Sequence, residues 1–457
     1  MPGPRPQRVL PAAVLTPASA LAATALITTA LAATTPPALA SPTAERAGDL
    51  DAAKARLVAH STLPAATYVP GSEPSGAWTT GNAAIPAPYP GQPVQGFSAT
   101  HRLADGSFLV MSDNGFGAKA NSADFLLAVH RIRPNAADLP TAADPRAGRT
   151  EATAYLGTPL RLSDPDRRVP WPIWRDGACA SATSLPAGYS CPTPDRLLTG
   201  WDFDIESMQL AADGTYWFGD EFGPYLLHTD ATGRLLEAPV PTPGVRSPSN
   251  PELGSATPNL AGSKGFEGMA VAPDLGTLHP MLEGTVAEDR AAGRDRDLRI
   301  YTVRTSGVAT FAPTWVHYRM EDAANAIGDF ALVNDHQGLV IERDNNQGAA
   351  ARTKRVYLVD LDRVDAEGVV HKELLVDLMA LPNPQHLGGF GDPFTFPYVT
   401  IEDVEVVDRR TIAVMNDNNF PAAGGRSATE PDVNEYLEIR LPRALDVAPS
   451  LLPSGAP

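Results

Sequence analysis

Acidic side chains at both ends of a short hairpin-like stretch indicate a site for a hard cation. The stretch IESMQLAADGTYWFGDEFG, residues 205–223, has two apolar runs around Asp213-Gly214, as a β-hairpin with a two-residue turn would. Such a turn sets Glu206 opposite Glu221, although like charges directly across a strand pair are destabilising. A calcium ion takes about six to eight oxygen ligands from carboxylates, amides and water, so its binding would offset this repulsion.

The same unit recurs along the chain. Four other stretches share the pattern of a strand that begins with a polar residue, a tight turn, and a strand that ends in acid. The turns set opposite each other Ser98 and Asp113, Glu267 and Glu283, Asp329 and Glu342, and Glu402 and Asp417. In a single hairpin such acids would be interpreted as solvated strand ends. Their repetition in one register favours a shared acidic site.

Side-chain alternation places several of these glutamates on the core-facing side of their strands. Glu206 shares a face with Met208 and Leu210, and Glu267 and Glu402 stand in equivalent register. A carboxylate near a core is unfavourable by several kcal/mol unless its charge is compensated. The predicted calcium ligands are Asp113, Glu206, Glu221, Glu267, Glu283, Glu342, Glu402 and Asp417.

The elements that position these acids are expected to be the strands of an all-β fold. Repeated β units that cannot bury both faces alone favour a β-propeller, in which the first strand of each blade lines a central channel. The acidic strand ends would then converge at one mouth of the channel. We expect six blades, with seven as the alternative, and a propeller domain over residues 65–445.

Composition shifts divide the rest of the chain. Residues 1–40 carry only two charges, Arg5 and Arg8, before a long apolar run and a small-x-small cleavage site, which predicts a secretory signal peptide. An uncleaved membrane anchor is the alternative. Residues 41–64 are expected to form a linker or short helix. Residues 133–200 are expected to be an insertion and 446–457 a C-terminal tail.

Two cysteines and the net charge agree with export. Cys179 and Cys191 lie close together in a loop-like segment, so in an oxidising compartment we expect a disulfide, which would be a local staple and not essential for activity. A metal site or a reactive thiol is the alternative. A formal net charge of −17 argues against nucleic acid or an anionic membrane surface as the partner. We expect a secreted, extracellular monomer without a membrane span.

The motifs of the repeated units resemble those of the phytase-like domain family, described as having esterase-like activity of phytase. The matching strings run in order over about residues 93–440 and are GFSATHRLADGSFLVMSDNGFG, DIESMQLAADGTYWFGDEFGPYLLHTDATGR, KGFEGMAV, DLRIYTV, IGDFALVNDHQGLVIERDN and IEDVEVVDRRTIAVMNDNNF. The resemblance implies a relation to calcium-dependent propeller phytases, and hence a phosphate ester as substrate.

Such a site could hold phosphate oxygens on calcium, neutralise charge in the transition state and activate a bridging water. Candidate catalytic residues beside the acid Glu267 are Lys264 and Arg343, each placed to clamp a phosphoryl group, and His101, placed to act as a general acid. Each basic residue has an alternative role, as an ordinary surface charge for Lys264 and Arg343 and as a structural histidine for His101.

Other hydrolytic motifs are absent from the sequence. It has no G-x-S-x-G elbow, no H-x-x-x-H or H-x-H pair and no G-x-x-x-x-G-K-[ST] loop. Three classes of function therefore stay open. The first is a secreted calcium-dependent phosphoesterase acting on phytate or another organic phosphate ester. The second is a calcium-dependent propeller lactonase or esterase, and the third is a non-catalytic binding propeller with structural calcium.

Overall fold

The computed structural model describes residues 54–135, 151–179, 191 and 195–452. The predicted signal peptide at residues 1–40 lies outside the described residues. Within the described part of the chain, no helix is long and apolar enough to cross a membrane. The Cys179–Cys191 disulfide is confirmed.

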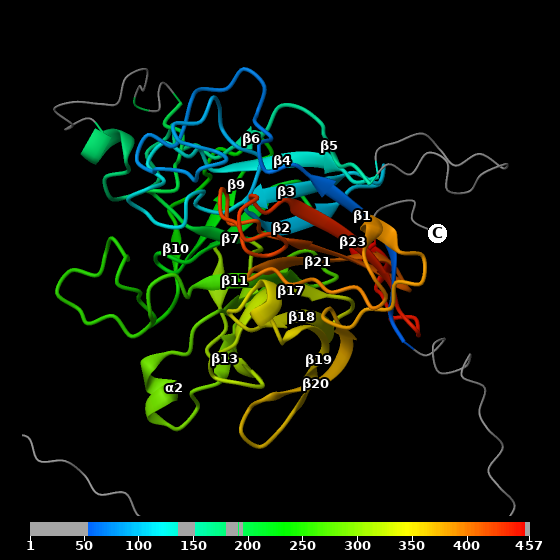
Figure 1. Cartoon of the computed structure of the whole chain (residues 1–457). Coiled ribbons are helices and arrows are strands. Elements are labelled where there is room, and N and C mark those ends of the chain that lie inside the picture. Colours follow the sequence, from blue (N-terminus) through cyan, green and yellow to red (C-terminus); the bar gives the residue numbers. More distant parts are fainter. Residues whose placement is uncertain (1–53, 136–150, 180–190, 192–194, 453–457) are drawn as a thin grey trace, which may run out of the picture. The chain divides into compact units, whose positions relative to one another are not determined.

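Five antiparallel sheets make up the fold (Figure 1). The first contains β2 (Phe97–Arg102), β3 (Phe108–Ser112), β4 (Ala128–Arg133), β5 (Ala154–Tyr155) and β6 (Leu160–Arg161). The second contains β7 (Ile205–Leu210), β8 (Tyr216–Asp220), β9 (Tyr225–Thr229) and β10 (Val240–Pro241). The third contains β11 (Phe266–Val271), β12 (Thr277–Leu282), β13 (Asp297–Ile300), β14 (Val303–Arg304), β15 (Thr310–Phe311) and β16 (Val316–Arg319).

The remaining two sheets have four strands each. The fourth contains β17 (Ala326–Leu332), β18 (Gln337–Arg343), β19 (Lys354–Val364) and β20 (Val370–Asp377). The fifth contains β21 (Ile401–Asp408), β22 (Thr411–Asn416), β23 (Asn434–Arg440) and β1 (Arg56–Leu63). The helical turns are short and are η1 (Arg175–Cys179), α2 (Ala287–Ala291), η2 (Gly348–Ala350), η3 (Leu387–Gly389) and η4 (Pro449–Leu451).

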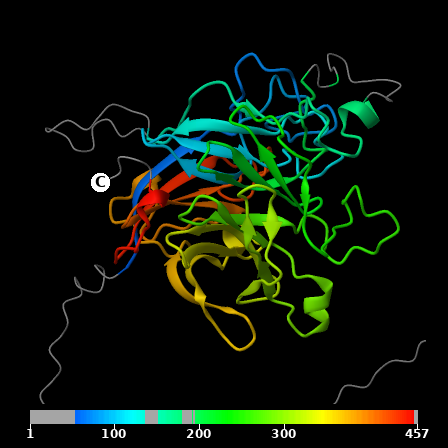
Figure 2. The same ribbon diagram turned by 180° about the vertical axis from the view of Figure 1, so that it is seen from behind.

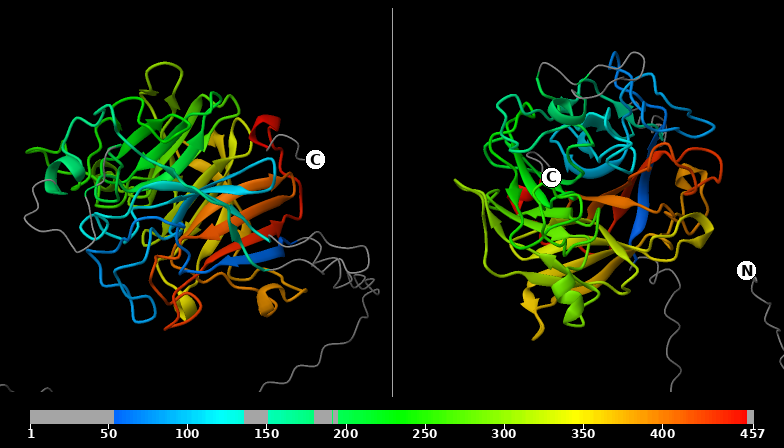
Figure 3. Two further views of the ribbon diagram at one scale, coloured as in Figure 1. Left: turned by 90° about the horizontal axis from the view of Figure 1, so that it is seen from above. Right: turned by 90° about the vertical axis from the view of Figure 1, so that its left-hand side faces the viewer.

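The first strands of the five sheets form a closed ring. β2 contacts β7, β7 contacts β11, β11 contacts β17, β17 contacts β21, and β21 contacts β2. Figures 2 and 3 show the sheets following one another around the ring in sequence order. The fold is therefore a five-bladed propeller, and the expectation of six blades, or seven, is wrong. Each of the five hairpin units found in the sequence supplies the first two strands of one blade, and the rest of the described chain forms the outer strands and the connections.

A strand from the beginning of the described chain completes the last blade. β1 pairs with β23 in antiparallel register, from Arg56 opposite Arg440 to Leu63 opposite Asn434, and Figure 1 shows the blue strand beside the red one. The expectation of a linker or short helix over residues 41–64 is therefore wrong for residues 56–63. Without β1, strand β23 would have an unpaired outer edge. The pairing of β1 with β23 joins the beginning of the described chain to the last blade and so closes the ring.

Apolar side chains fill the space between neighbouring blades. One cluster joins Ala99 and Met111 of the first blade to Met208 and Phe218 of the second. Another cluster joins Met281 of the third blade with the fourth blade. Removing apolar surface from water stabilises a fold by about 25 cal/mol per Å². These contacts between blades therefore fix the spacing of the first strands, and with it the positions of the side chains at the mouth of the ring.

Candidate functional site

A bulge near the start of every first strand, at its second residue in four blades and at its third in the fourth blade, sets the geometry of the mouth. In β7, Ile205 pairs with Asp220 and Ser207 pairs with Gly219, so Glu206 has no partner across the strand pair. The same irregularity leaves unpaired Ser98, Glu206, Glu267, Gly328 and Glu402. The prediction that Glu206 lies directly opposite Glu221 is therefore wrong, as are the equivalent pairings in the other units. The extra residue bends the strand start and takes the carboxylate out of the pairing register.

The second strand of each blade contributes another residue at the same end. Each of these residues directly follows the partner of the residue just before the bulge, and they are Asp113, Glu221, Glu283, Arg343 and Asp417. The fourth blade departs from the acidic pattern at both positions, with Gly328 and Arg343. Gly328 has no room for a side chain, because a Cβ there would lie 1.9 Å from the carbonyl oxygen of Ile401 in the next blade.

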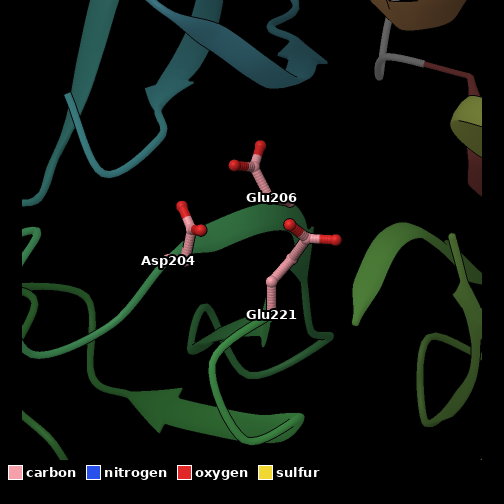
Figure 4. Close-up of side chains that lie close together, drawn as sticks. All are labelled: Asp204, Glu206 and Glu221. Atoms are coloured by element: carbon pink, nitrogen blue, oxygen red, sulfur yellow. The ribbon is translucent and has the colours of Figure 1, made fainter. Parts of the chain in front are cut away.

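Three carboxylates gather at the second blade. One ligand oxygen each from Asp204, Glu206 and Glu221 can be chosen so that all lie within 4.8 Å of one another (Figure 4). Asp204 directly precedes β7, and its carboxylate accepts hydrogen bonds from Asn114 Nδ2 at 2.7 Å and from Ser263 Oγ at 3.4 Å. No ion pair to any of the three acids is formed within the described residues.

Burial dominates the electrostatics of this trio. It raises the pKa of Glu206 well above its usual range, and repulsion from Asp204 adds to the effect. It likewise raises the pKa of Glu221, with further repulsion from Glu283 and Asp204. For Asp204, burial outweighs its hydrogen bonds and raises its pKa to about 6. The charged forms of all three therefore need a counter-charge.

Glu221 also belongs to a second trio, with Glu267 and Glu283, whose oxygens meet the same 4.8 Å limit. This trio has cations of its own. One terminal nitrogen of Arg343 lies 3.3 Å from Glu267, 3.4 Å from Glu283 and 3.1 Å from Glu402. Lys264 forms an ion pair with Glu283. Burial alone would lower the pKa of Arg343, but Glu402, Glu283 and Glu267 outweigh it and raise the pKa above its usual value.

A third group of acidic side chains lies where the first and last blades meet. Gly96 approaches both Asp113 and Asp417, since a Cβ at Gly96 would lie 2.5 Å from Asp113 Oδ1 and 3.6 Å from Asp417 Oδ1. Burial, then repulsion from Asp417, raises the pKa of Asp113. Ser98 Oγ donates to Glu402 at 3.2 Å and completes the contact between these two blades.

Two predicted site residues are not brought to the mouth. Glu342 faces away from the ring, where it accepts hydrogen bonds from Tyr318 and Asn325 and forms an ion pair with Lys372 at 2.9 Å. His101 lies three residues along β2 from Ser98, which is roughly 10 Å of strand. It lines a separate cavity of about 480 Å³ together with Gln209 and Glu405. The structure does not bring either residue to the carboxylate trios.

The two other basic candidates lie at the mouth but differ in access. The Arg343 side chain is 5% exposed and is surrounded by three glutamates, so it acts as an internal counter-charge. The Lys264 side chain is 39% exposed at the rim, where a ligand can reach it. Burial lowers the pKa of Lys264, but its carboxylate partners, first Glu283, outweigh this and raise it.

Sequence reasoning missed Asp204 and its partner Asn114. A signal for Asp204 is present, because Asp202, Asp204 and Glu206 alternate with apolar residues in DFDIE, as side chains along one face of a strand do. No local pattern marks Asn114 as the residue that bonds Asp204, since the two come from different blades.

The residues at the second blade fit a hard divalent cation. Three carboxylates converge there without an ion pair among the described residues, and Glu221 Oε1 is buried with no hydrogen-bond partner. Carboxylate and amide oxygens are the donors that calcium prefers. The second trio fits less well, because Arg343 and Lys264 already form ion pairs with two of its three carboxylates.

A family model and a curated relative match the chain. The family model for phytase-like proteins, described as esterase-like activity of phytase, matches residues 92–420. An uncharacterized secreted protein of Arthroderma benhamiae is 25% identical over 194 residues, which cover 34% of this chain and 37% of that protein. The chain thus spans little more than a third of the length of that relative.

Several solved structures share a broad likeness with the chain. A protein of unknown function from Dyadobacter fermentans aligns with a TM-score of 0.37 at 10% identity, over 85% of this chain and 99% of that one. A luciferin-regenerating enzyme aligns with a TM-score of 0.36 at 10% identity, over 80% and 97%. A putative gluconolactonase aligns with a TM-score of 0.29 at 11% identity, over 86% and 99%. At such low identities and TM-scores, these likenesses carry no argument about activity.

Proposed function

Because the chain belongs to the phytase-like family, described as esterase-like activity of phytase, we propose that it is a secreted calcium-dependent phosphoesterase. The observation that supports this most directly is the trio Asp204, Glu206 and Glu221, which is buried and lacks a cationic partner among the described residues. We propose that these three residues hold one calcium ion and that the substrate is a small organic phosphate ester.

Calcium bound at the trio would supply a Lewis acid that polarises a phosphoryl oxygen and favours ionisation of water. The chain's own residues set up the place for this chemistry. Asn114 and Ser263 orient Asp204 through their hydrogen bonds. Lys264 stands at the rim with an accessible ammonium group that can contact an anionic substrate. The burial of Glu206 and Glu221 keeps water from competing for their oxygens.

The disulfide and the secreted relative support an extracellular location. The acidic charge supports a small molecule and not a nucleic acid as the partner. A calcium-dependent lactonase or carboxylic esterase is the second candidate, because the family description names an esterase-like activity and a calcium ion polarises a carbonyl as well as a phosphoryl group.

A substrate panel tests the proposal. Phosphate monoesters including phytate, phosphate diesters, lactones and simple carboxylic esters are offered to the exported protein with calcium and with chelator. We expect calcium-dependent release of phosphate, lost in Asp204→Asn and kept in Asp335→Asn, an exposed control on a distant turn. Calcium-dependent hydrolysis of lactones or carboxylic esters without phosphate release would favour the second candidate, a lactonase or carboxylic esterase. Calcium binding without turnover of any substrate would leave a binding propeller.

A further inference from the structure

A lysine in the connection between β3 and β4 of the first blade lies over two aromatic rings of the second blade. The Nζ atom of Lys119 is 4.2 Å from the centre of the Trp201 ring and 5.4 Å from that of the Phe222 ring. Lys119 is half-buried, and among the described residues it forms no ion pair, in contrast to Lys264 and Arg343. An ammonium group has three N–H donors, and the rings occupy only part of its surroundings. This lysine is therefore held in place with donors free for a ligand.

The loop that carries Lys119 is fastened to the proposed calcium trio. Asn114 donates to Asp204 at 2.7 Å through Nδ2, and its Oδ1 accepts from the backbone N–H of Gly117 and from Ser122 Oγ. One amide side chain thus fixes both a carboxylate of the trio and the loop around Lys119. On the opposite side, Phe222 directly follows Glu221 in the chain.

The aromatic shelf formed by Trp201 and Phe222 is supported from the disulfide-bonded insertion. The Trp201 ring lies 5.7 Å from that of Trp174, which lies 5.3 Å from that of Trp78. The backbone N–H of Trp174 donates to Asp202 at 2.6 Å. Cys179 packs in the same apolar cluster as Trp174. Aromatic pairs of this kind stabilise a structure beyond the area they bury.

We propose that Lys119, held on the Trp201–Phe222 shelf, is a substrate-binding residue that contacts the anionic group of the ester at the calcium trio. It thereby sets a preference for anionic over uncharged esters. This inference rests on the proposed function, and it goes beyond it by assigning the anion contact to a residue outside the repeated acidic units. The fixed ammonium group loses little rotamer freedom when a ligand binds, since the two rings and the anchored loop already order it.

The shelf also gives the insertion a role at the site. Asp202 accepts from Trp174 with one oxygen and from Thr199 with the other, which holds the turn between Trp201 and Asp204. The segment leading into β7 is therefore positioned from outside the ring. The Cys179–Cys191 bridge lies in the same apolar cluster as Trp174 and Trp201.

The test compares Lys119→Met and Lys119→Arg with wild type, and uses Lys54→Met as a control at an exposed lysine elsewhere. For an anionic phosphate monoester, we expect Lys119→Met to raise KM by about tenfold or more, as loss of a charge-assisted hydrogen bond does, with kcat changed far less. KM for an uncharged carboxylic ester should not change. Lys119→Arg should recover most of the loss, and calcium affinity should stay as in wild type. An unchanged KM for the phosphate ester in Lys119→Met would overturn the proposal.

Calorimetric binding of inorganic phosphate to the calcium-loaded protein separates this inference from the proposed function. If wild type hydrolyses no ester but binds phosphate at least about tenfold more tightly than Lys119→Met, the anion contact stands and the hydrolytic function fails. Equal phosphate affinity in both, or no phosphate binding to wild type, overturns the contact. Should Lys119→Met fail to fold, Trp201→Leu removes the shelf and keeps the lysine. It should weaken phosphate binding too, and wild-type phosphate affinity in this variant would count against the proposal.

Discussion

Two trios of carboxylates meet at Glu221, and they differ in the cations that accompany them. Asp204, Glu206 and Glu221 form no ion pair among the described residues, whereas Glu267 and Glu283 both pair with Arg343, and Glu283 also pairs with Lys264. The difference arises in the fourth blade, where Arg343 stands at the position that holds an acid in the other four blades. Because a basic residue replaces an acid at this one position, one part of the mouth has cations of its own, and the other part has carboxylates without an ion pair among the described residues.

The difference between the two trios should disappear when Arg343, the cation inside the second trio, is removed. Arg343→Met leaves Glu267, Glu283 and Glu402 without their shared guanidinium group, and losing one partner of a buried charge pair costs about 3–5 kcal/mol. We expect the free energy of unfolding to fall by about that amount in chelator. Calcium should recover part of the loss, and calorimetry should then detect two bound calcium ions in place of one. Unchanged stability in chelator would show that Arg343 does not carry the charge balance of its trio.

Two glutamates at the bulged position of their blades test whether calcium binds at the second blade alone. Glu206→Gln and Glu402→Gln make the same chemical change in different blades, one without a cationic partner and one paired with Arg343. A ligand at about 100 times its dissociation constant stabilises the native state by about 2.7 kcal/mol. We expect this calcium-dependent gain to be lost in Glu206→Gln and largely kept in Glu402→Gln.

Thermal melts with calcium and with chelator measure both variants, and magnesium serves as the control cation because it fits a large oxygen cage poorly. An equal loss of the calcium response in the two variants would mean that calcium binds across the whole ring and not at the second blade.

The smallest effect concerns Glu405, an acid deeper along β21 that forms no ion pair within the described residues. Burial, then repulsion from Asp329, raises the pKa of Glu405 to about 8, compared with roughly 4.3 in an unfolded chain. The folded state therefore holds this proton more tightly. The stability it contributes is fully present below pH about 4.3 and is lost as the pH rises towards about 8.

In metal-free protein we expect Glu405→Gln to match wild type near pH 4 and to exceed its free energy of unfolding by about 1–2 kcal/mol at pH 8. Denaturant unfolding at a series of pH values measures this, with exposed Glu430→Gln as the control. A wild-type stability that rises over this pH range, or a variant with the same pH profile as wild type, would contradict the expectation.

The sequence by itself determined the repeated hairpins. Turn residues such as Asp213-Gly214 and Asp105-Gly106, flanked by alternating apolar residues, act over a few neighbouring positions, and all five units form the strand pairs expected of them. The acids at the strand ends and the nearby cysteines are equally local features, and the disulfide formed as expected. The family match also follows from these motifs.

Which of these acids come together, and which cations lie beside them, depends on the tertiary structure. Pairing by turn position fails at Glu206 and its equivalents, because a bulge changes a period-two register by one residue without any marker in the sequence. The number of blades and the place of β1 depend on ring closure, which joins residues hundreds of positions apart. The same reason explains why Arg343 acts as a counter-ion, why Glu342 faces away from the ring and why Asp204 belongs to the trio. Their partners come from other strands or blades, and a carboxylate's charge balance is a property of its neighbours in space and not of its position in the chain.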